Sequence, residues 1–268
     1  MGGDEVAVEI EAAAPEDDND NDNDNGLPFQ EDAMEDVPAR VTFIDYLKSP
    51  VINLLVGQGD EQALLTAHQA LLVTSPWFAE ACARFSDEVS ERRIDLIDED
   101  LDAVGCFLEF LYTGDYFPRK LPRSRELERD LSLPSVDETG DQLLKHARVY
   151  TLGETLNLPS LKSLASSKIH CVNSTAKGEI AYARYVYAHT QKDDQSIRAP
   201  VANFWATRSH TLRAEAEDEF RMMCLEFPQF GYDVLTRVLD EKLKREKTEK
   251  LHPTSTPSGS SRKRIRNI

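Results

Sequence analysis

Apolar positions in the first third of the ordered chain predict a short helix followed by a β-hairpin. A helical face comes first, and Ser49-Pro50 ends it, because a proline disfavours helix in the residue before it; its apolar members are Val41, Phe43, Ile44 and Leu47. Residues 51–56 are β-branched or leucine and predict a strand closed by Gly57. Gln58-Gly59-Asp60 predicts a turn, and residues 62–67 predict the returning strand of the hairpin.

Helical spacing then alternates with one further strand. His68 opens a short helical run, and Ser75-Pro76 provides an N-cap with proline at the first position of the next helix. Residues 93–97 predict a short third strand, in which Ile94 and Leu96 alternate with polar residues. Asp98 or Asp100 can cap the helix that follows, which ends at Thr113-Gly114.

The second half of the chain predicts helices only, after an interruption. Residues 117–140 hold three prolines and equal numbers of basic and acidic residues, which predicts a surface insertion without a core of its own. Helical spacing resumes over 143–152 and 161–169 and continues from 178 to 240. One predicted helix carries Val201, Phe204, Trp205 and Leu212, and the last carries Tyr232, Leu235, Val238 and Leu239.

The net charge of −17 lies mostly at the N-terminus. Residues 1–39 hold 14 acidic residues and no Lys or Arg, which predicts a disordered acidic tail. The alternating Asp and Asn residues around Gly26 resemble a calcium loop, but Pro28 and the missing flanking helices favour the tail. Residues 249–268 are rich in Ser, Thr and Pro and then basic, and they predict a second disordered tail.

Composition excludes several classes of protein. The longest apolar runs are far shorter than the roughly 20 residues that cross a bilayer, and the acidic start is unlike a secretory signal. Four cysteines without a CxxC pair predict free thiols in a reducing, intracellular compartment, and the acidic body disfavours nucleic acid as its partner. Without a phosphate-binding or hydrolase motif, we expect no enzyme, cofactor, metal or small-molecule substrate.

Residues 51–169 resemble the BTB/POZ domain, in the style of fungal BTB proteins that continue into further helices. The resemblance is carried by six pieces in order: the strand Val51–Gly57, His68 with Leu71-Leu72, Ser75-Pro76-Trp77-Phe78, Ile94-Asp95-Leu96, Phe107–Gly114, and the pair Ala147–Leu152 and Leu158–Leu161. It implies an α/β (α+β) fold, with a small sheet flanked by helices and an all-helical C-terminal extension. The expected division is a BTB unit over 40–175 and a helical region over 176–248.

The resemblance also implies function through protein contact: self-association and, in many members, docking to the cullin scaffold of a ubiquitin ligase. Members of that adaptor class carry an apolar-x-Glu motif, which Val89 and Glu91 match, and Tyr112 joins them as a candidate partner-binding residue. An ordinary polar loop explains the same three-residue pattern about equally well. His68 is implied to be a structural residue at the junction of strand and helix.

A second function remains open, namely a BTB-type oligomerising regulator of transcription or chromatin. It rests on a basic cluster that is a candidate nuclear-import signal: Arg262, Lys263, Arg264 and Arg266. The protein is therefore expected in the cytoplasm, the nucleus or both. His170-Cys171 is the one adjacent His/Cys pair, and it lacks the further ligands that a zinc site needs.

Overall fold

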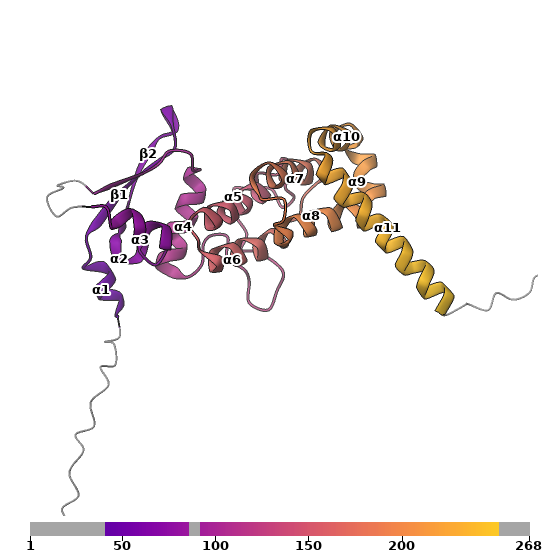
Figure 1. The fold of residues 1–268 in the computed structure, drawn as a ribbon. Helices are drawn as coiled ribbons and strands as arrows, with labels where there is room; N and C mark the ends of the chain where they lie inside the picture. Colours follow the sequence, from indigo (N-terminus) through magenta and orange to yellow (C-terminus); the bar gives the residue numbers. More distant parts are fainter. Residues whose placement is uncertain (1–40, 86–91, 252–268) are drawn as a thin grey trace, which may run out of the picture. The chain divides into compact units, whose positions relative to one another are not determined.

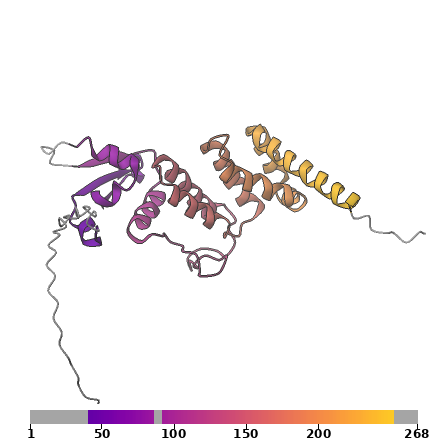
Figure 2. The same ribbon diagram turned by 60° about the horizontal axis from the view of Figure 1, so that its bottom comes forward.

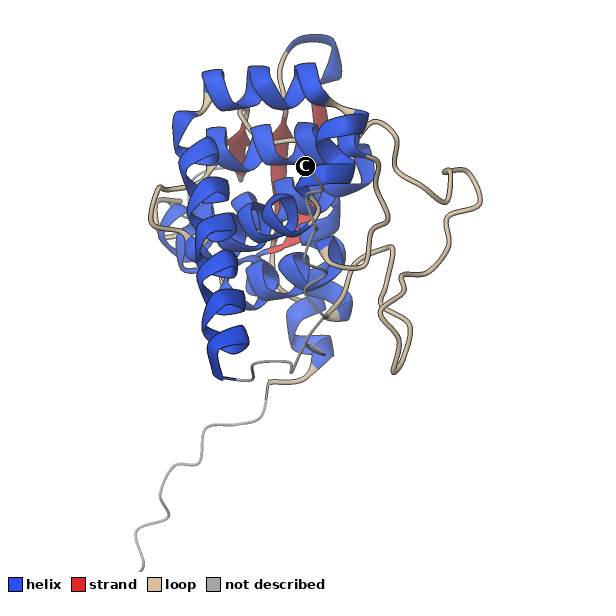
Figure 3. Cartoon of the chain, turned by 90° about the vertical axis from the view of Figure 1, so that its right-hand side faces the viewer, coloured by secondary structure: helices blue, strands red, loops and turns tan. Residues whose placement is uncertain are grey.

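A small sheet and a succession of helices make up the chain. The computed structural model describes residues 41–85 and 92–251, without the side chains of residues 61 and 249–251 (Figure 1). Within these residues it has one three-stranded sheet and eleven α-helices, so the expected mixed α/β class is confirmed (Figure 3).

The sheet is built on a central strand that is apolar on its buried face. Strand β1 (Val51–Val56) pairs antiparallel with β2 (Ala63–His68) and parallel with β3 (Arg93–Leu96), in the order β2-β1-β3. The side chains of Ile52, Leu54 and Val56 alternate with more exposed neighbours and are fully buried. A 3-10 turn, η1 (Gly59–Glu61), joins β1 to β2, so the predicted hairpin and third strand are confirmed.

Four helices belong to this first part of the chain: α1 (Phe43–Leu47), α2 (Gln69–Leu72), α3 (Pro76–Cys82) and α4 (Leu101–Thr113). The Ser75 hydroxyl accepts the Phe78 N–H at 3.4 Å, as expected of an N-cap, and donates to the Leu156 carbonyl at 2.7 Å. Asp100 rather than Asp98 caps α4, since its carboxylate accepts the Ala103 N–H at 2.9 Å.

Seven further helices follow: α5 (Asp141–Thr155), α6 (Pro159–Ile169), α7 (Ala176–His189), α8 (Gln195–Thr207), α9 (Ser209–Glu215), α10 (Glu217–Glu226) and α11 (Pro228–Leu251). Helix α5 packs against α4, α6 and α7 and so joins the first part of the chain to the later helices (Figure 2). The single helix expected to carry both Trp205 and Leu212 is two helices, because the backbone leaves helical geometry at Arg208.

The buried face of α11 differs from the leucine-rich face that the sequence predicts. Phe230 and Val234 are buried, whereas Tyr232, Leu235 and Leu239 are more than half exposed. Both sets fit the helical period, and the neighbouring aromatic rings of Trp205 and Phe220 select Phe230. The predicted helix is therefore confirmed, but the expected apolar face is wrong.

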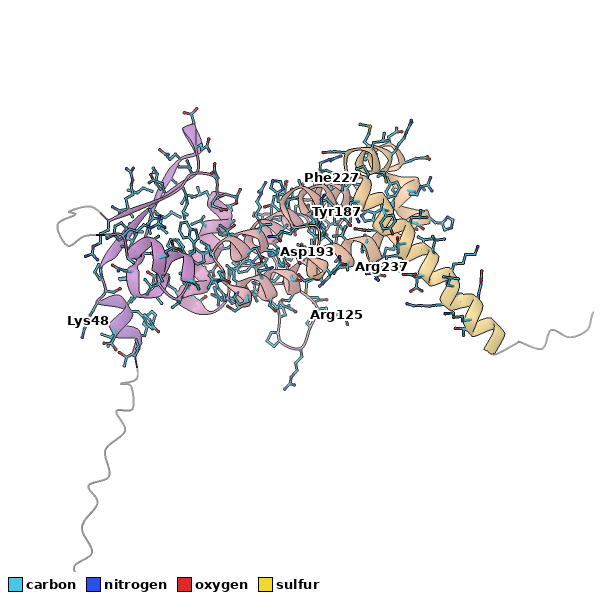
Figure 4. The ribbon with its side chains drawn as sticks, in the orientation of Figure 1. Lys48, Arg125, Tyr187, Asp193, Phe227 and Arg237 are labelled. Atoms are coloured by element: carbon cyan, nitrogen blue, oxygen red, sulfur yellow. The ribbon has the colours of Figure 1, made fainter. Side chains whose placement is uncertain are left out.

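The insertion between α4 and α5 is held by a buried carboxylate near its end. Asp137 is 2 % exposed, and its two oxygens accept the backbone N–H groups of Gly140 at 2.8 Å and Leu143 at 3.0 Å, at the start of α5. Its own backbone bonds to Asn173 and Thr175, between α6 and α7. Arg125, by contrast, lies on the exposed loop of this segment (Figure 4).

We expect Asp137→Ala to lower the free energy of unfolding by about 2–3 kcal/mol, because two buried N–H groups lose a charged acceptor. Urea denaturation measures the loss. Asp130→Ala is the control, since that carboxylate accepts hydrogen bonds only from exposed Ser132 and its removal should change stability by no more than about 0.5 kcal/mol. Equal losses in the two variants would contradict the role of Asp137.

Candidate protein-interaction site

Helix α1 presents apolar side chains to solvent and buries none of its residues. The side chains of this α1 surface are 43–60 % exposed: Val41, Phe43, Ile44 and Leu47. Val51, at the start of β1, is also half exposed. Phe43, Ile44 and Leu47 lie on the helix, and Val41 lies two residues before it. Single exposed apolar residues are ordinary, but a group of four on and beside one short helix is typical of an interaction surface.

A few backbone contacts attach α1 to the rest of the chain. The Ser49 hydroxyl accepts the Ala70 N–H at 3.0 Å and donates to the Tyr46 carbonyl at 2.7 Å. The Pro50 carbonyl accepts the Gln69 N–H at 2.8 Å. These bonds fix the end of α1 beside the start of α2, so the position of the helix does not require burial of its apolar side chains.

The start of α1 has its own local cap. The carboxylate of Asp45 accepts both the backbone N–H and the hydroxyl of Thr42, each at 2.7 Å. These hydrogen bonds hold the pKa of Asp45 below its usual value. The first turn of α1 is therefore stabilised by a capping box between Thr42 and Asp45.

Tyr112, the one predicted partner-binding residue that the structure describes, contacts His68. The phenol oxygen accepts the His68 backbone N–H at 3.1 Å and lies 2.6 Å from the ring Nδ1. Since the oxygen already accepts one hydrogen bond, its own proton is free to be donated to Nδ1. His68 is the N-cap of α2 as well as the end of β2, so the pair ties α4 to this junction.

Arg92, the first described residue after the predicted motif, lies near the contact between Tyr112 and His68. Arg92 donates to the Gln69 side chain at 2.7 Å, and its carbonyl accepts the Asn53 N–H at 2.8 Å. Gln69 follows His68 directly, so the return of the chain into β3 lies near the contact between Tyr112 and His68. Val89 and Glu91 themselves, and the basic cluster over 262–266, lie outside the described residues.

A buried ammonium group, which sequence reasoning did not identify, anchors the start of the insertion. The Lys168 side chain is fully buried, and its Nζ lies 2.6 Å from the Asp115 carboxylate and 2.9 Å from the Pro118 carbonyl. It also donates to the Tyr116 carbonyl and lies 3.7 Å from the centre of the Tyr116 ring. Burial lowers the pKa of Lys168, although Asp115 opposes that shift.

His146 lies next to this anchor and lines a cavity of about 980 Å³ between the insertion and α5. Its Nδ1 is 2.9 Å from the Tyr116 hydroxyl. Burial, with help from Lys168, lowers the pKa of His146 to about 3. An imidazole with that pKa is a weak general base near neutral pH, so the group favours a structural role.

The described residues offer neither a metal site nor an activated thiol. Across residues 41–85 and 92–251, no three His, Cys, Asp or Glu side chains gather where they could hold a metal ion. The four cysteines are free thiols, and burial raises the pKa of Cys106 to about 11, which keeps it protonated. In the same part of the chain, no helix is long and apolar enough to cross a membrane.

We expect His146 to make stability depend on pH. Its pKa is near 6.5 when unfolded and about 3 when folded, so the unfolded chain binds the proton more readily and stability falls as pH drops below about 6.5. Wild type should lose about 2 kcal/mol relative to His146→Gln between pH 7 and pH 5. Urea denaturation of both proteins measures this difference.

Glu179 shifts stability in the opposite sense in both proteins, because burial raises its pKa to about 7 and its stabilising contribution is lost as pH rises through that value. Comparison with His146→Gln cancels this contribution. A difference between the two proteins that stays constant from pH 7 to pH 5 would contradict the buried neutral imidazole.

The resemblance to BTB/POZ domains rests on the sequence residues quoted above. Comparison with known proteins finds no matching family model and no matching curated protein.

Proposed function

We propose that the chain is a protein–protein interaction module of BTB type that self-associates through the α1 surface. In this role it acts as a substrate adaptor for a cullin-based ubiquitin ligase, with Val89, Glu91 and Tyr112 at the scaffold contact. The observation that carries the proposal is the α1 surface: three apolar side chains of a capped and attached helix, with Val41 just before it, remain in solvent.

Burial of the α1 surface against a second chain would be energetically favourable. Full burial of one large apolar side chain contributes about 1.5–3 kcal/mol relative to exposure. Four such side chains therefore supply enough favourable free energy to offset part of the cost of association, which is several kcal/mol. A second copy of the chain offers the same apolar surface, and a two-fold contact lets each copy bury the surface of the other.

Support for the adaptor role comes from the corner around Tyr112. Its hydroxyl bonds to His68, and Arg92, the first described residue after the predicted motif, bonds to adjacent Gln69. An apolar side chain and a carboxylate that lie a few residues before Arg92 in the sequence suit an apolar groove on a helical scaffold.

Association through the α1 surface should be lost when charge enters it. Phe43→Asp/Ile44→Asp places two carboxylates where two apolar side chains would be buried, so the mass measured by sedimentation at a fixed protein concentration should fall. Because both positions are more than half exposed, circular dichroism should be unchanged. Lys48→Glu, at the end of the same helix (Figure 4), is the matched control and should still associate. An unchanged mass for the double variant would contradict the proposed surface.

Scaffold binding has its own test. Purified wild type should capture a cullin in a pull-down, and Val89→Asp/Glu91→Lys should reduce capture by about tenfold or more, because the apolar anchor and its carboxylate are both replaced. Lys192→Glu, on an exposed site after α7, should not reduce it. Equal and poor recovery by wild type and the double variant would overturn the adaptor role and leave self-association standing.

A further inference from the structure

Helix α11 has two apolar faces, only one of which is covered. On the covered face, Phe230 is fully buried, with its ring centre 5.4 Å from that of Tyr187, 5.8 Å from that of Phe220 and 6.1 Å from that of Trp205. Val234 continues this face one turn later. This side of α11 is therefore buried against the neighbouring helices.

The opposite side carries what we call the α11 outer stripe. Its members are 51–65 % exposed and are spaced by three, four and four residues: Tyr232, Leu235, Leu239 and Leu243. This spacing keeps them on one line along the helix, roughly opposite Phe230 and Val234. Four large apolar side chains in a row are more than a monomeric surface usually presents on one helix.

Residues 242–248 of α11 do not pack against any other described part of the chain. All residues from 242 to 248 are exposed, so nearly two turns of helix have no packing partner within the described chain (Figure 1). Isolated helical turns are only marginally stable in water, since most helical stability in proteins comes from tertiary packing. A partner along the outer stripe would supply that packing.

Charge along α11 changes sign near the middle of the helix. Residues 228–241 hold Asp233, Asp240 and Glu241 against one arginine, Arg237 (Figure 4). Residues 242–248 hold four basic residues against Glu246. Two such helices packed antiparallel bring the acidic segment of each toward the basic segment of the other, whereas parallel packing places like charges together.

We propose that the α11 outer stripe binds a second copy of the same stripe in antiparallel orientation. This contact goes beyond the proposed adaptor function and is separate from the α1 surface. It is isologous, so each copy buries the apolar row of the other. A contact made by one helix pair is small, and we expect micromolar affinity.

The test removes the α1 contact first, so that the two surfaces are measured apart. Sedimentation equilibrium of the full chain carrying Phe43→Asp/Ile44→Asp should still show association that rises with concentration. Adding Leu239→Asp/Leu243→Asp should weaken this association by at least about tenfold, because charges replace the C-terminal half of the apolar row. Thr248→Asp, exposed and off the stripe, is the control and should leave association within about threefold.

Charge reversal tests whether the partner is a second copy of α11 and whether the two helices pack antiparallel. Pairing the two rows antiparallel sets residue 242 of one copy opposite residue 233 of the other, where an ammonium group meets a carboxylate. Lys242→Glu should therefore weaken association, and adding Asp233→Lys in the same chain should restore it, since opposite charges again face each other.

Three outcomes would overturn the inference. The first is a chain with α1 disrupted that is monomeric throughout the micromolar range. The second is weakened association that the combined reversal does not restore. The third is stripe-dependent binding to anionic phospholipid vesicles without self-association, which would assign the stripe to a membrane surface. If the α1 proposal alone fails, disruption of α1 leaves association unchanged and the α11 variants still report on the stripe.

Discussion

Buried polar groups at the two ends of the insertion hold the helical part of the chain in place. Lys168, from α6, holds the segment just after α4 through Asp115 and two backbone carbonyls. Asp137 caps the start of α5 and bonds to the link between α6 and α7. Removing one partner of a buried ion pair, such as Lys168 with Asp115, costs about 3–5 kcal/mol. Since α5 packs against α4, α6 and α7, the later helices depend on these two anchors.

The two exposed apolar surfaces are not needed to hold the core together. Neither the α1 surface nor the α11 outer stripe contributes to the described core, because each lies on a helix that other contacts hold. Helix α1 is held by Ser49 and Pro50, and α11 by Phe230 and its aromatic neighbours. Their apolar side chains lower the solubility of a monomer and stabilise an assembly. Both surfaces fit a protein that acts by binding other chains.

Local signals in the sequence were enough to predict several elements. Ser75-Pro76 starts α3 and Gly114 ends α4 in the left-handed conformation, because cap chemistry depends on neighbouring residues. The burial of Lys168 could not be predicted in this way, since two of its partners are backbone carbonyls about 50 residues away. The covered face of α11 was also beyond prediction, because two apolar rows share one helical period and they are distinguished by contacts with the distant rings of Tyr187, Trp205 and Phe220.

The same limit applies to the candidate site. The four apolar residues of α1 were identified as one helical face, but the sequence pattern is the same whether that face packs inward or remains exposed. The link between Tyr112 and His68 joins residues 44 positions apart and has no local signature. Val89 and Glu91 stay predictions from resemblance, since they lie outside the described residues.

The proposed function requires that a second chain covers the α1 surface in the assembled protein. Hydrogen–deuterium exchange of the full chain, measured at a low and a high protein concentration, tests it most directly. Exchange of the amides over 43–48 should slow as concentration rises, while the buried strand β1 exchanges equally slowly in both samples. Equal exchange over 43–48 at both concentrations, in a sample that sedimentation shows to be associated, would contradict the claim.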